Sequence, residues 1–439
     1  MKTLFNFIFI LFTSLALLSC DSNEPQSAST LNLSVEDVSC TEAWLQLKTA
    51  NLNLPNRITL FVNDLKYREY LINKSDTLLY IDSLLPNKSY SFKAISFYNT
   101  EDGVKSNKVV STTMDTTSHN FSNWQTFTWG NIGTSVLVDV AIINENDIWA
   151  VGDIMLRDSS PAGYTDYNAV HWDGNSWELK RIMFYYNCLT RDYSYSFGIS
   201  SILVINPNEI WVSMDGTQIA KIVNGVQTDT ICMPYEDFSI KKMWGTSSDD
   251  LYLVGYAGNI VHYDGTNWNR IESGTSLSIN DIWGDYNQKT KEWEILAVAS
   301  NIYSGFEKQV IKISNNSASI ISNTGIEEPL NSVWFKTNKK YYLVGSGSYE
   351  KSRLTEAEWK GDPLDFTEYF ENHIRANDIN DVIAVGAYGE VLHFNGYNWK
   401  SYISKTYISG NLLSVDIKNN LIVFCGIEYS SAVLKTGKR

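Results

Sequence analysis

Gly258–Trp268 reads Gly-Asn-Ile-Val-His-Tyr-Asp-Gly-Thr-Asn-Trp, and Gly389–Trp399 repeats it as Gly-Glu-Val-Leu-His-Phe-Asn-Gly-Tyr-Asn-Trp. Ala169–Trp177, Ala-Val-His-Trp-Asp-Gly-Asn-Ser-Trp, is a shorter copy. Self-similarity of this kind marks a repeat architecture. The repeat predicts the scaffold and leaves the function open, because function depends on the residues that a scaffold carries.

Each repeat also contains a predicted strand that ends in Val-Gly or an equivalent pair. These pairs begin at Val151, Val254, Val344, Val385 and Cys425, with weaker copies at Ser213 and Val298. By subtraction, successive markers lie 62, 41, 44, 46, 41 and 40 residues apart, close to the repeat of a four-stranded propeller blade. We therefore predict an all-β chain with a seven-bladed β-propeller over residues 122–439 and an insertion in the long interval.

The ends of this region predict how the ring closes. The last unit, Leu412–Lys435, supplies only three strands, whereas Asn123–Trp129 resembles the fourth-strand segment Asn175–Leu179. We expect Asn123–Trp129 to complete the last blade, because closure removes unpaired sheet edges.

The repeated phrase makes two further predictions, one about its turns and one about its histidines. The Asp-Gly or Asn-Gly pairs at 173–174, 264–265 and 395–396 predict hairpins in which both residues have positive φ. His171, His262 and His393 occupy one slot of three blades, so we predict a structural role for them rather than a shared zinc site.

Residues 1–19 have the pattern of an export signal, with Lys2 before an apolar run. Leu17, Ser19 and Cys20 resemble a bacterial lipobox, which implies cleavage before Cys20 and acylation of that cysteine. The alternative is an ordinary secretory peptide with a coincidental cysteine. Residues 20–30 are polar and predict a flexible tether. We expect a lipid-anchored cell-envelope protein, with the outer membrane favoured and the face, periplasmic or surface, left open.

Residues 31–113 read as short alternating strands, with Ala43, Leu45 and Leu47 on one face. Leu84, Pro86 and Tyr90 have the spacing of the tyrosine corner in fibronectin type III domains, so this segment resembles that family and implies a β-sandwich. Trp44 departs from the pattern, because it lies out of phase with its inward-facing neighbours. Residues 114–121 form the predicted linker to the propeller.

Composition excludes several functions. The formal net charge is -14 and the sequence pI is near 4.9, with no cluster of Lys and Arg, so nucleic-acid binding is not expected. The sequence contains no recognised cofactor or metal motif, and we predict neither. Cysteines 40, 188, 232 and 425 are scattered singly, and we interpret them as small buried hydrophobic residues.

Candidate ligand-binding residues come first from the predicted innermost strands. Aligned repeats place Trp244, Trp283, Trp334 and Arg375 in one slot, with Asp281 and His373 in the slot before it. These side chains could form the wall of a ligand cup in the axial channel. The alternative is that the tryptophans wedge between blades.

Further candidates come from two insertions, Asp153–Asp166 and Met183–Gly198, which should meet on one rim of the propeller. They carry Tyr164, Tyr185, Tyr193 and Tyr195, whose amphipathic rings suit glycan stacking and protein interfaces alike. The alternative is that these long loops only pack against the ring.

These features favour a membrane-anchored binding protein that recognises a glycan or a protein, with the oligomeric state open and a monomer expected. The turns are similar to those of sialidase-like Asp-box propellers and photosystem-assembly-type propellers, although the order Ser-x-Asp-x-Gly is absent. Some envelope relatives of this type carry a glycosyltransferase label. A carbohydrate-active enzyme at the channel mouth is therefore the main alternative, and an envelope assembly scaffold is the second.

The lipobox resemblance makes a direct prediction. Cys20→Ser removes the sulfur that would carry the acyl chain, and buried methylenes contribute about 0.8 kcal/mol each to membrane binding. We expect this variant to leave the membrane fraction and the detergent phase. Detergent partitioning equal to that of the native protein would contradict lipidation at Cys20.

Overall fold

The computed structural model describes residues 28–96, 103–191, 194–301, 305–314, 316–362 and 367–439. The predicted signal peptide, Cys20 and Tyr193 lie outside these ranges. Contacts divide the chain into two compact units, of which the first includes Trp44–Tyr80 and Tyr90–Ser111 and the second includes Thr112–Arg439. Within the described ranges, no helix has the length and apolar character needed to cross a bilayer.

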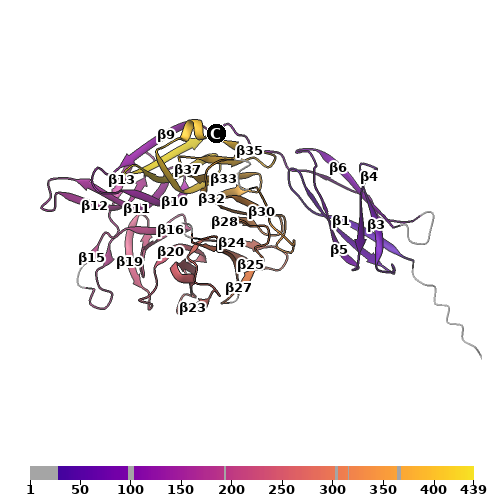
Figure 1. Cartoon of the computed structure of the whole chain (residues 1–439), viewed down its shortest axis with the longest axis horizontal. Helices are drawn as coiled ribbons and strands as arrows, with labels where there is room; N and C mark the ends of the chain where they lie inside the picture. Colours follow the sequence, from indigo (N-terminus) through magenta and orange to yellow (C-terminus); the bar gives the residue numbers. More distant parts are fainter. Residues whose placement is uncertain (1–27, 97–102, 192–193, 302–304, 315, 363–366) are drawn as a thin grey trace, which may run out of the picture. The chain divides into compact units, whose positions relative to one another are not determined.

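The first unit is built on two sheets (Figure 1). One has the order β1 (Thr30–Val38), β2 (Ala43–Ala50), β5 (Asp76–Ile81); the other has the order β4 (Leu65–Ile72), β3 (Asn56–Val62), β6 (Ser89–Ser96), β7 (Val104–Lys105), with β8 (Val109–Thr112) pairing β6. Leu45 and Leu47 are buried, as the alternation predicts, and Trp44 is buried as well. Its ring lies 6.0 Å from that of Tyr80.

The described part of the second unit contains seven four-stranded antiparallel sheets, numbered here in chain order. Sheet 1 is β10 (Val136–Asn144), β11 (Asp147–Arg157), β12 (Tyr164–Trp172) and β13 (Trp177–Lys180). Sheet 2 is β16 (Ile199–Asn206), β17 (Glu209–Met214), β18 (Gln218–Val223) and β19 (Val226–Cys232). Sheet 3 is β20 (Ile240–Ser247), β21 (Asp250–Gly255), β22 (Asn259–Tyr263) and β23 (Trp268–Glu272).

Sheet 4 is β24 (Ile279–Asn287), β25 (Glu292–Ser300), β26 (Lys308–Ser314) and β27 (Ser317–Ile321). Sheet 5 is β28 (Leu330–Lys336), β29 (Lys340–Gly345), β30 (Ser348–Lys351) and β31 (Lys360–Asp362). Sheet 6 is β32 (Glu371–Asp378), β33 (Asp381–Gly386), β34 (Val391–Phe394) and β35 (Trp399–Ser401). Sheet 7 is β36 (Gly410–Lys418), β37 (Leu421–Glu428), β38 (Ser431–Lys438) and β9 (Ser122–Trp129).

Short elements lie between the sheets. The pair β14 (Phe184–Tyr185) and β15 (Ser194–Tyr195) joins sheets 1 and 2, η1 (Tyr256–Gly258) lies in sheet 3, and α1 (Ile403–Thr406) precedes sheet 7.

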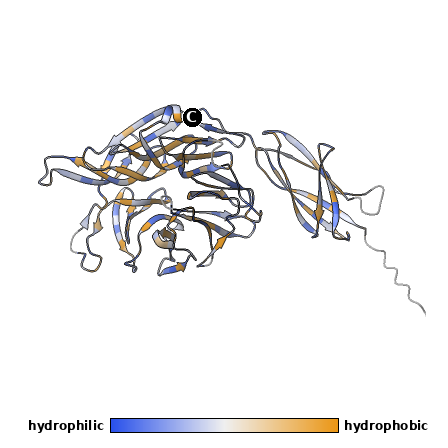
Figure 2. Cartoon of the chain, viewed as in Figure 1, coloured by the Kyte–Doolittle hydropathy of each residue, from blue (hydrophilic) through white to orange (hydrophobic). Residues whose placement is uncertain are grey.

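The first strands of the sheets are neighbours in chain order, and β10 also contacts β36. Hydrophobic clusters lie between consecutive sheets, and one that includes Val140 and Val423 joins sheets 1 and 7. Figure 2 shows the matching hydrophobic colouring along the strands. This arrangement, with almost no helix, is that of a β-propeller. We call the face where first strands begin the start face and the opposite one the end face.

The repeated turn differs from the predicted hairpin. The Asp264 carboxylate accepts the backbone N–H groups of Thr266 and Asn267, at 2.9 and 2.6 Å, so the acidic side chain caps the turn. Gly265 has φ 86°, whereas Asp264 is not among the residues with positive φ. The expectation of two positive φ values is therefore wrong, because the carboxylate supplies the turn's hydrogen bonds.

The repeated histidines bond to the acidic residue that begins the second strand of their own sheet. His171 Nε2 lies 2.9 Å from Asp147 Oδ1, and His262 Nε2 lies 2.7 Å from Asp250 Oδ1. The third pair is His393 and Asp381, at 3.0 Å. Each histidine bonds within its own sheet, as a structural role requires.

The pairing of β9 with β38 predicts that Trp124 is a stability determinant. Its ring packs on Tyr402 and Phe424, at 5.3 and 6.1 Å, and it is only partly exposed. Trp124→Ala should cost about 2–3 kcal/mol, somewhat below the range for fully buried tryptophans. The measurement is the calorimetric unfolding temperature, with Trp293→Ala at an exposed position as control. An equal effect of the two substitutions would contradict this role.

Candidate functional site

A ring of buried polar side chains surrounds the axis of the second unit. At one position of five of the seven first strands, a side chain accepts a backbone N–H of the next sheet. Asp139 accepts from Ile202 (3.0 Å), Ser201 from Met243 (3.1 Å), Asp281 from Val333 (3.1 Å), Ser332 from Ile374 (3.2 Å) and His373 from Val415 (3.1 Å). These hydrogen bonds join equivalent positions of neighbouring first strands. The first strands therefore run in the same direction, and the bonds hold consecutive sheets in register.

Two ion pairs complete this polar ring. Arg375 donates two hydrogen bonds to Asp281, both 2.9 Å long, and Lys242 Nζ donates to Asp139 Oδ1 at 2.7 Å. Burial alone would raise the pKa of Asp281, but the Arg375 guanidinium holds it well below its usual range. Buried carboxylates of this kind need such partners. Asp281 and Arg375, both predicted as ligand-binding residues, therefore form an ion pair with each other.

Two cavities lie on either side of this ring. The start-face cavity has a volume of ≈ 440 Å³ and is lined by residues from all seven first strands, including Val138, Ser200, Lys241, Asn280, Asn331, Asn372 and Leu413. The end-face cavity has a volume of ≈ 460 Å³. Lys242 and His373 line both, so the polar ring separates the two.

The candidate tryptophans do not lie together in one cup. Trp244 and Trp283, with Arg375, line the end-face cavity, and Trp334 lines neither cavity described above. Trp244 packs into sheet 4, where a Cβ on Gly284 would lie 2.3 Å from its ring. Trp334 is buried between sheets 5 and 6. Trp244 and Trp334 thus pack between sheets, as the alternative prediction has it, rather than forming the wall of one ligand cup.

His373 is the predicted candidate that reaches the start-face cavity. Burial, with the nearby charges of Arg375 and Lys242, holds its pKa well below 6.5. Because Nδ1 accepts the Val415 N–H, the neutral ring carries its proton on Nε2. Nε2 is buried, has no hydrogen-bond partner among the described residues and lies 3.9 Å from Asp281 Oδ2.

The two insertions meet on the start face, as predicted. Ser196 Oγ donates to the carbonyl oxygen of Asp166 at 3.1 Å, and Asn168 Nδ2 donates to that of Phe197 at 2.8 Å. Cys188 and Cys232 form a disulfide that ties the second insertion to β19. Our interpretation of these two cysteines as buried hydrophobic residues is wrong, since only the folded insertion brings them together; Cys40 and Cys425 are buried thiols.

The predicted tyrosines lie beside the start-face cavity rather than in its wall. Tyr195 is 49% exposed and its ring lies 5.8 Å from Tyr186, which is 62% exposed. Tyr185 is partly buried beneath Arg191, at 5.2 Å, and Tyr164 is partly buried in β12. Tyr195 and its neighbour Tyr186 are therefore exposed, and Tyr193 lies outside the described residues.

Exposed aromatic residues gather on the start face. Loops between second and third strands, and links between sheets, open on this face. Eight of the ten exposed aromatic side chains of the described second unit belong to these segments: Tyr186, Tyr195, Tyr256, Phe306, Phe370, Tyr388, Tyr407 and Tyr429. The other two, Trp293 and Tyr397, do not. We call seven of them, all except Phe306, the aromatic rim. Tyr256 of this rim also lines the start-face cavity, whereas Phe306 lines a separate cavity.

Sequence reasoning missed a row of polar residues in the cavity wall. Asn280, Asn331 and Asn372 each donate to a carbonyl oxygen of the next sheet, at 2.7–3.0 Å. Asn331 Oδ1 is buried without a hydrogen-bond partner among the described residues. Lys241 Nζ donates to Asn280 Oδ1 at 2.6 Å, and burial lowers the pKa of this ammonium. The sequence contains a pattern that could have predicted this row, because asparagine precedes the polar-ring position in three consecutive repeats.

Comparison with known proteins supports the fold alone. No family model and no curated protein matches this chain. A structure of YCF48 bound to D1 peptide is 14% identical with a TM-score of 0.54, covering 74% of this chain and 97% of that one. YCF48 from Cyanidioschyzon merolae is 13% identical with a TM-score of 0.51, covering 72% and 98%. The chain is thus similar in fold to these propellers.

Glu371 is a buried titratable group that no sequence pattern singled out. It is 1% exposed at the start of β32, and Oε1 has no hydrogen-bond partner in the described structure. Burial, with the charge of Glu390 adding to it, raises its pKa to about 8. The folded protein therefore keeps this proton at neutral pH, whereas the unfolded chain releases it above about 4.5.

This difference gives a pH prediction for Glu371→Gln. As pH rises from about 4.5 to 8, Glu371 should cost stability on the order of 1 kcal/mol per pH unit, and the neutral glutamine should not. The two proteins should be nearly equally stable near pH 5, with the variant more stable at pH 7.5 by on the order of 3 kcal/mol. Urea unfolding at both pH values measures this, and parallel pH profiles would contradict a protonated Glu371.

Proposed function

We propose that the chain is a lipid-anchored envelope protein whose propeller binds a polypeptide partner at the aromatic rim and the start-face cavity. The observation that carries the proposal is the gathering of exposed aromatic side chains on the face that holds a cavity lined from all seven first strands. Aromatic residues are the usual anchors of protein interfaces. The neutral or cationic partner expected from the net charge of -14 is compatible with this surface.

In this proposal, each four-stranded sheet is one blade of a seven-bladed propeller that β9 closes, and the first unit is a fibronectin type III-like sandwich. The supporting observations are the pairing of β9 with β38 and the contact between β10 and β36. The two-sheet order of the first unit agrees with such a sandwich.

A polypeptide partner is favoured over a catalytic role at the channel. The similar YCF48 structure contains a bound D1 peptide, which supports a peptide as the class of ligand. A glycosidase needs two available carboxylates across a sugar. Asp139 and Asp281 are instead engaged by Lys242, Arg375 and backbone N–H groups. The carbohydrate-active alternative therefore has less support, and an assembly scaffold is compatible with partner binding.

An envelope location has one supporting observation in the fold. The Cys188–Cys232 disulfide suits an oxidising compartment outside the cytoplasm. It agrees with the export signal expected at residues 1–19 and with anchoring through Cys20.

The test combines affinity capture with a paired substitution. The immobilised native protein would be incubated with detergent-solubilised envelope, and captured polypeptides would be identified by mass spectrometry and titrated. Tyr186→Ala with Tyr195→Ala removes two anchors, each worth about 2 kcal/mol, so binding should weaken about a hundredfold or more.

The matched control is Trp293→Ala with Tyr397→Ala, which removes two exposed rings outside the aromatic rim. This control should bind as the native protein does. Equal loss in both double variants, or no loss in either, would contradict binding at the aromatic rim.

A further inference from the structure

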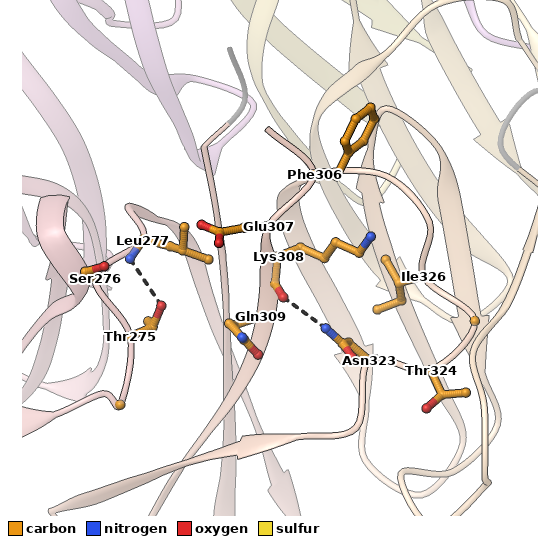
Figure 3. A pocket seen from close by; sticks show the side chains of 12 residues that line it. Thr275, Ser276, Leu277, Phe306, Glu307, Lys308, Gln309, Asn323, Thr324 and Ile326 are labelled. Atoms are coloured by element: carbon orange, nitrogen blue, oxygen red, sulfur yellow. Dashed lines mark hydrogen bonds between the residues drawn. The ribbon is translucent and has the colours of Figure 1, made fainter. Parts of the chain in front are cut away.

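A second cavity lies on the start face, over sheet 4 and apart from the axis. Its volume is ≈ 670 Å³, and it lies between three segments, 274–277, 306–309 and 323–326 (Figure 3). None of these residues lines the start-face cavity. The volume falls in the range of small-molecule sites, about 300–1,000 Å³.

Uncommitted hydrogen-bonding groups line this cavity. Figure 3 shows Glu307 and Gln309 between the segment of Ser276 and that of Asn323. The side chains of Glu307, Gln309 and Ser276 make no hydrogen bond or ion pair with the described residues. Together they offer an amide, a hydroxyl and a carboxylate, so both donors and acceptors are available.

The walls are fixed by bonds that leave these groups available. Asn323 Nδ2 donates to the carbonyl oxygen of Lys308 at 3.0 Å, which joins two of the three segments. The backbone N–H of Trp359 donates to Thr324 O at 2.8 Å. Gly325 has φ +87°, and a Cβ there would lie 2.2 Å from Trp359 O. The cavity wall is therefore shaped before any ligand arrives.

An aromatic ring and an apolar floor accompany the polar groups. Phe306 is 70% exposed at the edge of the cavity, whereas Leu277 and Ile326 are buried beneath it. An exposed ring can stack on the C–H face of a sugar, while amide and hydroxyl groups bond to its hydroxyls.

The Glu307 carboxylate disfavours an anionic ligand. Lys308 is the cation that lines the cavity, and its Nζ donates to the carbonyl oxygen of Glu327 at 2.5 Å. The Glu307 carboxylate would repel phosphate or carboxylate. The amide and hydroxyl groups of this lining suit an uncharged ligand rich in hydroxyl groups. We infer that this cavity is a binding site for a neutral saccharide, separate from the polypeptide site proposed above.

The experiment screens the full-length protein on an array of neutral oligosaccharides and then titrates the bound sugar by calorimetry. Phe306→Ala removes the stacking ring and Gln309→Ala removes the amide. Each should weaken binding at least tenfold, and together about a hundredfold. Tyr407→Ala, an exposed ring elsewhere on the start face, should leave the sugar affinity unchanged.

Two outcomes overturn the inference: no neutral oligosaccharide binds, or a bound one keeps its affinity in the Phe306→Ala, Gln309→Ala double variant. Circular dichroism of each variant checks folding, and Phe306 is exposed enough for its loss to leave the fold intact. Capture of the polypeptide partner by the Gln309→Ala variant separates this site from the aromatic rim, since Gln309 is no part of that rim and the capture should not change.

Discussion

The second unit depends on hydrogen bonds that cross between neighbouring first strands at the polar ring. Backbone N–H groups at the centre of a ring of sheets are buried, and an unsatisfied one costs about 1–3 kcal/mol. Asp139, Ser201, Asp281, Ser332 and His373 accept these groups. The two carboxylates bring charge into the interior, which then requires Lys242 and Arg375. The need to satisfy buried backbone N–H groups thus accounts for both the carboxylates and the cations at the centre of the second unit.

That constraint also determines where function can lie. Because the polar ring fills the axis, the channel is two separate cavities, and its charged groups are engaged in holding sheets together. A ligand can approach either face but cannot use Asp281 or Arg375 without breaking their buried pair, which costs about 3–5 kcal/mol. The surfaces left for recognition are the start face, with its insertions and aromatic rim, and the more sparsely aromatic end face.

Local patterns predicted much of the fold and part of the site. The Asp-Gly turns, the Val-Gly strand ends and the likeness of Asn123–Trp129 to a fourth strand are short-range signals, and each corresponds to a strand or turn in the structure. The meeting of the insertions could also be predicted, because strand order places both loops on one face. Alignment of the repeats found the polar-ring position through Asp281 and His373.

Contacts that depend on three-dimensional direction could not be predicted from the same patterns. Trp244 and His373 differ by one slot, yet Trp244 reaches only the end-face cavity and His373 reaches both. A one-residue step along a strand moves a side chain along the axis and to the other side of the sheet. The Cys188–Cys232 disulfide joins residues 44 positions apart, and the path of the insertion, not a cysteine spacing, brings them together.

Backbone strain gives a separate reason to regard the start face as the functional one. Tyr388 and Tyr429 have φ 55° and 53° in the turns between second and third strands of sheets 6 and 7. Bulky residues rarely adopt this left-handed region, which costs them about 1–2 kcal/mol and which glycine enters freely. Both rings are exposed, at 51% and 78%, so burial does not offset the cost. The Tyr388 ring packs on Tyr369, at 5.2 Å, so Tyr429 is the one whose strain is the less offset by packing. Both tyrosines belong to the aromatic rim proposed to bind the partner, where such strain is compatible with a use outside the fold.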